Sequence, residues 1–522
     1  MFILINFPGI LDICWLNQTI MTNTPAKVLY EEYVNSMRTI ADLRYASAVL
    51  QWDQETYLPP KGAAIRGQQI ATLSEIAHRH FTDDKLGARL QELLAGNQLN
   101  ADEKRNVELT WQDYSKQKKF TSSFVREMAE AVNKSFHSWI EARKTNNFSL
   151  FAPDLARLVE LKKQEADMLG YEQHPYNALL DDHDKGATVQ LLDNVFNSIK
   201  QPLKDLLNAI GNQPPADDSF LQQHFDKDTQ WKFGMQVIKE MGYDLEAGRQ
   251  DISEHPFTVN FNSQDVRITT RVDENDLSNM VWSCIHEVGH ALYEQGLPLN
   301  QYGLPLGEPA SYTIHESQSR LWENHVGRSR AWCERWLPVL QQYFPKQLDK
   351  VSLEQFYKGI NKVQPSLIRT EADELTYHFH VMIRYELEKR VLEGSLPVKD
   401  IPVYWNDHYR QYLNVEIPSD KQGCLQDVHW SHGSFGYFPT YSLGSFYSAQ
   451  FFAFAEKALG KLDNHIRKGD TAALLQWLRN QVHIKGRRFT SEELCQDICG
   501  ETLNIEYFIG YLRNKYRDIY KF

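Results

Sequence analysis

Apolar residues recur every three or four positions along much of the first half of the chain. Residues 155–169 and 189–210 are two such runs, and this spacing is typical of amphipathic helices. Clusters of Gly, Pro and Asn, such as 211–215, separate the runs. The pattern predicts an almost wholly helical region from about 27 to 250, and residues 492–520 are predicted to be helical again.

The apolar spacing changes to every second residue after position 256. Phe257, Val259 and Phe261 alternate with polar residues, and a second alternating run covers 266–272. Residues 262–264 form a polar turn between the two runs, so together they predict an antiparallel hairpin. An edge strand can pair with an extended peptide, which makes a substrate rail one interpretation and a purely structural hairpin the other.

The next predicted helix, from Leu277 to Leu292, carries the sequence His286-Glu287-Val288-Gly289-His290. Residues four apart on a helix share one face and lie about 6 Å apart, so both histidines could bind one Zn²⁺. The glutamate lies one residue further round, where it could act on a water molecule without binding the metal. Gly289 weakens a helix, and its presence here indicates a closely packed neighbour.

Chance is the alternative explanation for so short a pattern, because the chain has 18 His among 522 residues. The apolar helix around the pattern and the sequence downstream favour a metal site. A catalytic zinc needs a third protein donor. Glu308 lies in a loop, whereas Glu316 lies near the start of a helix predicted over 314–326. Thr313 and Glu316 also fit a helix-capping box, but we assign Glu316 as the third ligand.

Two downstream segments contain groups that could build a site. Residues 368–374 are predicted to begin a long helix that includes Arg384 and Arg390. Residues 423–441 are rich in Gly, His, Tyr and Trp. Such a loop is costly to order unless it has a function.

Composition limits the class of function. The net charge is −12, which argues against nucleic acid because phosphate contacts need a basic surplus. No linker or repeat divides the chain, so we predict one catalytic domain over 21–522, with a helical part (about 21–250) and a metal-site part (about 251–522). The six cysteines include no Cys-x-x-Cys pair, and reduced thiols, Cys495 and Cys499 included, indicate a cytoplasmic protein.

The first 20 residues are apolar but do not fit a targeting sequence. They have no basic start and no small-residue cleavage site, and Pro8, Gly9 and Asp12 interrupt them. We therefore predict neither a signal peptide nor a membrane span. Met21 follows directly, and we interpret residues 1–20 as an extension that is not part of the fold.

Taken together, these motifs resemble the Taq family of metallocarboxypeptidases, a family of zinc peptidases. The resemblance covers about residues 30 to 520 and is far more specific than the histidine pattern alone. The segments that carry it are Trp52–Thr56, His255-Pro256-Phe257, Asp265-Val266-Arg267-Ile268-Thr269, His286–His290, His315-Glu316-Ser317-Gln318, Ile368–Asp373, Gly423–Trp430 and Gly500–Leu503.

The resemblance implies a mostly α-helical, single-lobed zincin-like peptidase with a deep groove and a small antiparallel sheet beside the metal helix. It implies removal of single residues from the C-termini of peptides, with broad preference and with C-terminal proline disfavoured. It also implies a homodimer, and Zn²⁺ as the metal, with Co²⁺ as a substitute.

We therefore interpret the chain as a cytoplasmic zinc carboxypeptidase that acts on peptides with a free C-terminus. His286, His290 and Glu316 would bind Zn²⁺, and Glu287 would be the catalytic base. Arg369 is the leading candidate to bind the substrate carboxylate, because a guanidinium can contact both oxygens.

Further candidates for substrate binding come from the other motifs. His429 and Tyr441 could stabilise the oxyanion. The remaining candidates, from the two motifs before the metal helix, are His255, Asp265 and Arg267.

Two other functions stay open. A zinc endo-oligopeptidase or dipeptidyl carboxypeptidase can share a helical fold and the same histidine pattern. A non-catalytic scaffold with structural zinc is disfavoured, because structural sites usually have four protein ligands and only three can be named here.

Overall fold

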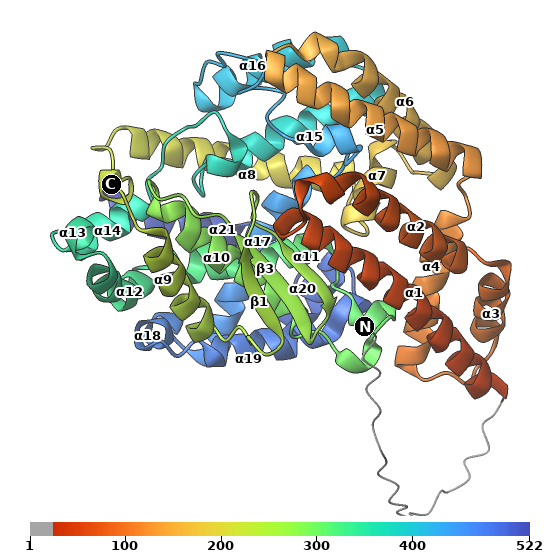
Figure 1. Ribbon diagram of the computed structural model, residues 1–522. Helices are drawn as coiled ribbons and strands as arrows, with labels where there is room; N and C mark the ends of the chain where they lie inside the picture. Colours follow the sequence, from red (N-terminus) through yellow and green to blue (C-terminus); the bar gives the residue numbers. More distant parts are fainter. Residues whose placement is uncertain (1–24) are drawn as a thin grey trace, which may run out of the picture.

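The computed structural model describes residues 25–522, so the extension predicted at 1–20 lies outside the described residues. Within this range, helices make up most of the molecule, and one three-stranded sheet lies among them (Figure 1). This arrangement agrees with the predicted fold class, a mostly α-helical protein with a small sheet beside the metal helix.

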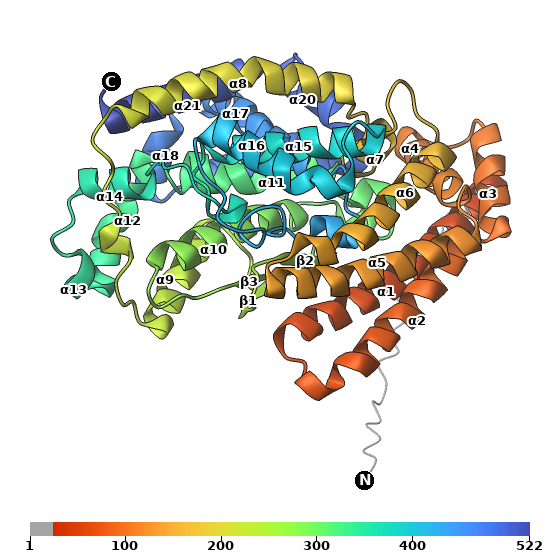
Figure 2. The same ribbon diagram turned by 90° about the horizontal axis from the view of Figure 1, so that it is seen from above.

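Four helices at the start of the described chain share a small hydrophobic core of their own. They lie together along one side of the molecule (Figures 1 and 2). Tyr33, Leu90 and Val107 are fully buried between them. Their bounds are α1 (Pro25–Thr56), α2 (Ala63–Phe81), α3 (Asp84–Ala95) and α4 (Ala101–Gln117).

The following helices contribute to a larger hydrophobic core that extends through the rest of the molecule. Two of them, α6 and α8, coincide with the amphipathic runs predicted at 155–169 and 189–210. The bounds are α5 (Ser122–Thr145), α6 (Ala152–Leu169), α7 (Tyr176–His183), α8 (Val189–Gly211) and α9 (Lys227–Glu240).

The predicted hairpin is confirmed. Its strands are β2 (Thr258–Asn262) and β3 (Asp265–Thr270), which pair antiparallel with Val259 opposite Arg267. A third strand, β1 (Gly248–Ile252), pairs parallel with the other side of β3. The sheet is therefore mixed rather than purely antiparallel, and β2 is one of its two edge strands.

The extra strand, β1, gives no alternating apolar signal in the sequence. Its two buried positions are Gln250 and Asp251, and both are polar. A strand with polar residues at its buried positions does not show the apolar alternation that identifies strands.

The helix that carries the two histidines is α10 (Leu277–Glu294). The carboxylate of Asp276 caps it by accepting a hydrogen bond from the Ser278 N–H at 2.9 Å. This agrees with the predicted start of the helix at acidic residues. In Figure 1, α10 lies beside the sheet, and it packs against β2 and β3 as well as against α9.

The next helix, α11 (Tyr312–Arg320), carries Glu316 and continues as the π-helical segment η6 (Leu321–Val326). The hydroxyl of Ser311 caps α11 by accepting a hydrogen bond from the Ile314 N–H at 3.0 Å. Ser311, not Thr313, is therefore the N-cap residue of α11. The alternative interpretation of Glu316 as part of a capping box is wrong, and the Glu316 carboxylate does not cap the helix.

The remaining helices complete the large core, and α17 packs along α11. Their bounds are α12 (Arg330–Tyr343), α13 (Pro345–Leu348), α14 (Leu353–Ile360), α15 (Tyr377–Glu393), α16 (Ile401–Leu413), α17 (Phe438–Leu459), α18 (Leu462–Lys468), α19 (Ala472–Gln481), α20 (Ser491–Cys499) and α21 (Glu506–Tyr520).

The helix predicted to start at residue 368 starts later. Arg369–Glu371 form a single 3₁₀ turn, and α15 begins only at Tyr377. The Asp373 carboxylate accepts hydrogen bonds from the N–H groups of Leu375 and Thr376, each at 2.9 Å. This carboxylate holds the chain in a turn before the helix, so Arg369 does not lie at a helix N-terminus.

No helix within residues 25–522 combines the length and apolar character that crossing a membrane requires. The five cysteines of the described chain, including Cys495 and Cys499, are free thiols. This agrees with the predicted absence of a disulfide between that pair.

Candidate metal centre

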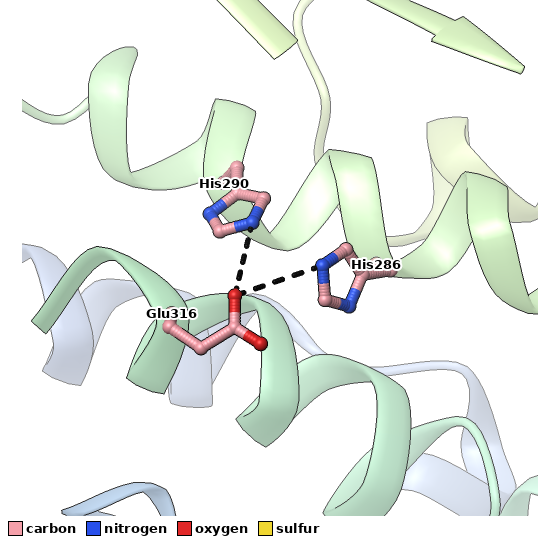
Figure 3. Close-up of side chains that lie close together, drawn as sticks. All are labelled: His286, His290 and Glu316. Carbon is pink, nitrogen blue, oxygen red and sulfur yellow. Dashed lines mark ion pairs between the residues drawn. The ribbon is translucent and has the colours of Figure 1, made fainter. Parts of the chain in front are cut away.

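Three side chains from two helices bring their donor atoms together. His286 and His290 lie one turn apart on α10, and Glu316 faces them from α11 (Figure 3). The Glu316 Oε2 atom lies 3.5 Å from His290 Nε2 and 3.8 Å from His286 Nε2. One donor atom of each residue lies within 4.8 Å of the other two, and among the His, Cys, Asp and Glu residues of 25–522 this is the one group of three that could hold a metal ion in this way.

This spacing fits a small metal ion. Donor atoms placed tetrahedrally at about 2.0–2.1 Å from a zinc ion lie about 3.4 Å from one another. The two N–O distances in the structure, 3.5 and 3.8 Å, are close to that value. Two imidazoles and one carboxylate are also a known ligand set of catalytic zinc. The residues therefore form a His–His–Glu metal site.

In both His286 and His290, the ring nitrogen that does not face Glu316, Nδ1, has a hydrogen-bond partner of its own. His286 Nδ1 lies 2.8 Å from Glu323 Oε2 and donates to it. His290 Nδ1 lies 2.5 Å from His315 Nδ1, and His315 Nε2 lies 2.8 Å from Glu294 Oε1. A carboxylate thus orients each ring, directly in one case and through a second imidazole in the other. Such partners fix the tautomer that presents Nε2 to a metal.

Glu287 lies beside the three ligands without joining them. Thr258 of β2 donates a hydrogen bond from Oγ1 to Glu287 Oε2 at 2.6 Å. The side chain is buried, and burial raises the pKa of its carboxyl group above the ordinary value. A carboxylate whose pKa is raised above its ordinary value is better suited to accept a proton and release it again.

Two glycines let α11 approach its neighbours closely. A Cβ atom at Gly289 of α10 would lie 2.5 Å from Ser319 Cα, and one at Gly444 of α17 would lie 2.7 Å from Glu316 Cβ. Both distances are shorter than a side chain tolerates, so only glycine fits at either position. The neighbour predicted for Gly289 is thus the backbone of α11, and this packing sets Glu316 opposite the histidines.

The metal site opens into a cavity of about 1260 Å³. Residues of α1, α2, α4, β2, α10 and α11 line it, among them His286, Glu287, His290 and Glu316. Small-molecule pockets measure about 300–1,000 Å³, so this cavity has room for several residues of a peptide. The deep groove that the family resemblance implies is present, and it lies between the first helices and the metal helix.

Three candidate substrate-binding residues cluster on one side of the site. Tyr441 lines the cavity, and His429 lies behind it, with Nε2 3.2 Å from the Tyr441 hydroxyl. Arg369 is also behind this tyrosine, with its guanidinium carbon 4.8 Å from the ring centre. It is 5% exposed and donates two hydrogen bonds to Asp427, so it does not form part of the cavity wall.

Three other candidates lie further from the metal ligands. His255 is exposed in the loop before β2. Asp265 and Arg267 of β3 pair with each other through hydrogen bonds of 2.8 and 2.9 Å. The Arg267 guanidinium also lies 4.4 Å from the centre of the Trp52 ring. None of the three lines the cavity around the metal site, and their roles in substrate binding stay predictions.

Glu308, the rejected alternative for the third ligand, has a different partner. It lies 3.2 Å from Arg487, which also donates two hydrogen bonds to Asp113. All three residues line the cavity. Arg487 is therefore an arginine of the cavity wall, whereas Arg369 is not.

Sequence reasoning assigned no role to His315, although it lies in one of the quoted motifs, and it missed four other residues that support the site: Thr258, Glu294, Arg320 and Glu323. Arg320 and Glu323 follow Glu316 by about one and two helical turns, and this spacing places them on the same face. That periodicity is a signal that could have identified them. The contact of Thr258 depends on how β2 lies across α10, which residue spacing does not reveal.

A helical fold whose cavity presents two histidines and a glutamate for a metal, with a second glutamate beside them, defines a metal-dependent peptidase. The sequence model of the family described as Carboxypeptidase Taq (M32) metallopeptidase matches residues 32–516. The chain therefore belongs to the carboxypeptidase Taq (M32) family and is a metallocarboxypeptidase.

Individual relatives support this assignment over nearly the full length. Carboxypeptidase 1 of Bacillus subtilis (strain 168) is 38% identical over 494 residues, which are 94% of this chain and 98% of that protein. A solved structure named CHT is 59% identical, with a TM-score of 0.92 over 94% of this chain and 99% of that one. The M32 carboxypeptidase of Deinococcus radiodurans R1 gives a TM-score of 0.93 at 38% identity, over 95% of this chain and 100% of that one.

Proposed function

We propose that the chain is a zinc carboxypeptidase that removes single residues from the C-termini of peptides, with broad preference and little action on C-terminal proline. The observation that carries this proposal is the His286–His290–Glu316 site in the wall of a peptide-sized cavity, in a chain of this family. Zn²⁺ suits these ligands, and Co²⁺ would substitute for it. The family resemblance also leads us to propose a homodimer.

The chain's own residues would share the chemical step. When bound, the metal would act as a Lewis acid toward water and the scissile carbonyl. Glu287 would take a proton from the attacking water and pass it to the leaving amine. Its place in the cavity wall and its hydrogen bond from Thr258, which holds one carboxylate oxygen, support this role.

The oxyanion that develops on the scissile carbonyl needs a hydrogen-bond donor in the cavity. Tyr441 is our choice, because its hydroxyl belongs to a residue of the cavity wall. His429 would orient that hydroxyl from behind, at 3.2 Å. Burial lowers the pKa of His429 to about 3, so its ring is neutral at pH 7 and does not compete as a cation for the substrate.

The substrate carboxylate also needs a positive partner, since a buried charge is costly without one. Arg369 remains our proposal for this role, although it would have to act past the ring of Tyr441. Arg487, which does line the cavity, is the alternative. Separate replacement of the two arginines decides between them.

Glu287→Gln tests the proposed mechanism. The variant should keep one zinc per chain, because Glu287 is not a ligand, and lose turnover by several orders of magnitude. The control His286→Ala should lose both zinc and turnover. If Glu287→Gln loses zinc while its fold stays intact, Glu287 is a ligand and the assignment of the base is wrong.

A further inference from the structure

The two carboxylate oxygens of Glu316 have different surroundings. Oε2 faces the histidines, 3.5 Å from His290 Nε2 and 3.8 Å from His286 Nε2. Oε1 accepts a hydrogen bond from Arg320 Nε at 2.7 Å. One oxygen is therefore directed at the metal position, while an arginine of the same helix occupies the other.

Arg320 is itself held in place. Its terminal NH1 group donates to Glu323 Oε2 at 3.1 Å, and its guanidinium carbon lies 4.7 Å from the centre of the Tyr377 ring. Only 17% of the side chain is exposed. Burial by itself would lower the pKa of Arg320, but the carboxylates of Glu316 and Glu323 outweigh this and raise it. The guanidinium is thus a permanent cation between two carboxylates.

Glu316 has little freedom to adjust. A Cβ atom at Gly444 would lie 2.7 Å from both Cβ and Cγ of Glu316, so the backbone of α17 is in contact with the stem of the side chain. Ser319 also donates a hydrogen bond to Glu316 Oε2 at 3.3 Å. For both oxygens to bind one metal, the carboxylate would have to turn and give up its hydrogen bond to Arg320.

We propose that Arg320 is a positioning residue that restricts Glu316 to binding the metal through a single oxygen, Oε2. A carboxylate can bind a metal through one oxygen or two, and hydrogen bonds from outside the ligand set select between these modes. With Oε1 held by Arg320, the protein supplies three donor atoms and leaves the rest of the coordination to water and substrate. The proposal rests on the metal site of the proposed function and adds the residue that sets its ligand number.

Substitution of Arg320 tests this proposal by metal spectroscopy as well as by activity. Arg320→Met removes both the charge and the donor, whereas Arg320→Lys keeps a positive charge and a donor. Arg328→Met is the matched control, because Arg328 lies 3.5 Å from Glu323 and contacts neither Glu316 nor the histidines. Each protein is loaded with Zn²⁺ for X-ray absorption and with Co²⁺ for visible absorption, which weakens when a four-coordinate ion gains a ligand.

In Arg320→Met the average number of oxygen neighbours around zinc should rise by one, and the visible absorption of Co²⁺ should fall. The kcat/KM should fall about 10- to 100-fold, the usual scale for losing an outer-shell partner. Arg320→Lys and Arg328→Met should keep the wild-type spectra. If Arg320→Met fails to fold, Arg320→Leu, which also has neither the charge nor a hydrogen-bond donor, replaces it, with the same change in spectra expected.

Wild-type spectra in folded, metal-loaded Arg320→Met would overturn the proposal, whatever its activity. The same change in Arg328→Met would also overturn it, because the effect would then be general to the buried charges. These outcomes are distinct from a failure of the proposed function, which would appear as wild-type protein that binds no zinc or is active without it.

Discussion

Gly289→Ala tests whether the close contact between α10 and α11 controls metal binding. The added Cβ would lie 2.5 Å from Ser319 Cα and 3.0 Å from the Gln318 carbonyl oxygen, so two stretches of backbone would have to separate. Overpacking of this kind costs about 1–3 kcal/mol, and removing a helical glycine returns about 0.5–1 kcal/mol. We expect a net loss of up to about 2.5 kcal/mol in the free energy of unfolding.

The same separation would move Glu316 away from the histidines. The expected fall in zinc affinity is about 10- to 100-fold, the scale for losing support of a ligand. Chelator competition measures the affinity, and urea unfolding of the metal-free protein measures the stability. Gly510→Ala on α21 is the matched control, because nothing lies within 4 Å of its added Cβ. It should gain about 0.5–1 kcal/mol and bind zinc normally.

A Gly289→Ala protein that gains stability like Gly510→Ala and binds zinc like the wild type would refute this reasoning. The distance between the two helices would then not be what fixes the third ligand.

Three further predictions concern the site and the core. Glu316→Ala should bind zinc far more weakly than wild type in chelator competition, whereas Glu308→Ala should bind it normally. Thr258→Val should keep zinc but lose about tenfold to a hundredfold in kcat/KM, because a hydrogen bond to a charged group is worth about 1.5–3 kcal/mol, and Thr258→Ser should recover most of it. Burial lowers the pKa of His325 from its ordinary value of 6.5 to about 3 in the folded chain. Above pH 6.5 the ring is neutral in the folded and the unfolded chain alike. As the pH falls from 6.5 toward 3, only the unfolded chain takes up the proton, so the free energy of unfolding decreases. His325→Phe should flatten that part of the thermal-stability profile.

The sequence predicted the elements whose residues repeat. Helical spacing located α6, α8 and α10, and alternation located the hairpin of β2 and β3. The ligands His286 and His290 were also predicted, because residues four apart lie on the same face of a helix, whereas Glu316 was chosen because the metal needs a third donor and because this residue lies near a helix start. Local periodicity is encoded in the order of residues, so the repeating elements and the histidine pair did not require knowledge of the tertiary fold.

The features that sequence did not predict depend on tertiary contacts. β1 has polar residues at its buried positions and forms only because β3 lies beside it. The start of α15 is set by Asp373, whose carboxylate holds a turn that spacing alone does not show. Arg369 was placed by its motif at a helix start in the site, but its partner Asp427 comes from a distant segment and draws it behind Tyr441.

The most direct test of the central claim compares two forms of one peptide, with a free C-terminal carboxylate and with a C-terminal amide. Mass spectrometry of the products over time shows which bonds are cut. We predict that the free acid yields a ladder of products shortened by single residues, that the amide is cut far more slowly, and that a chelator stops both until zinc is restored. Internal fragments, release of dipeptides, or equal cleavage of the amide would contradict the assignment as a single-residue carboxypeptidase.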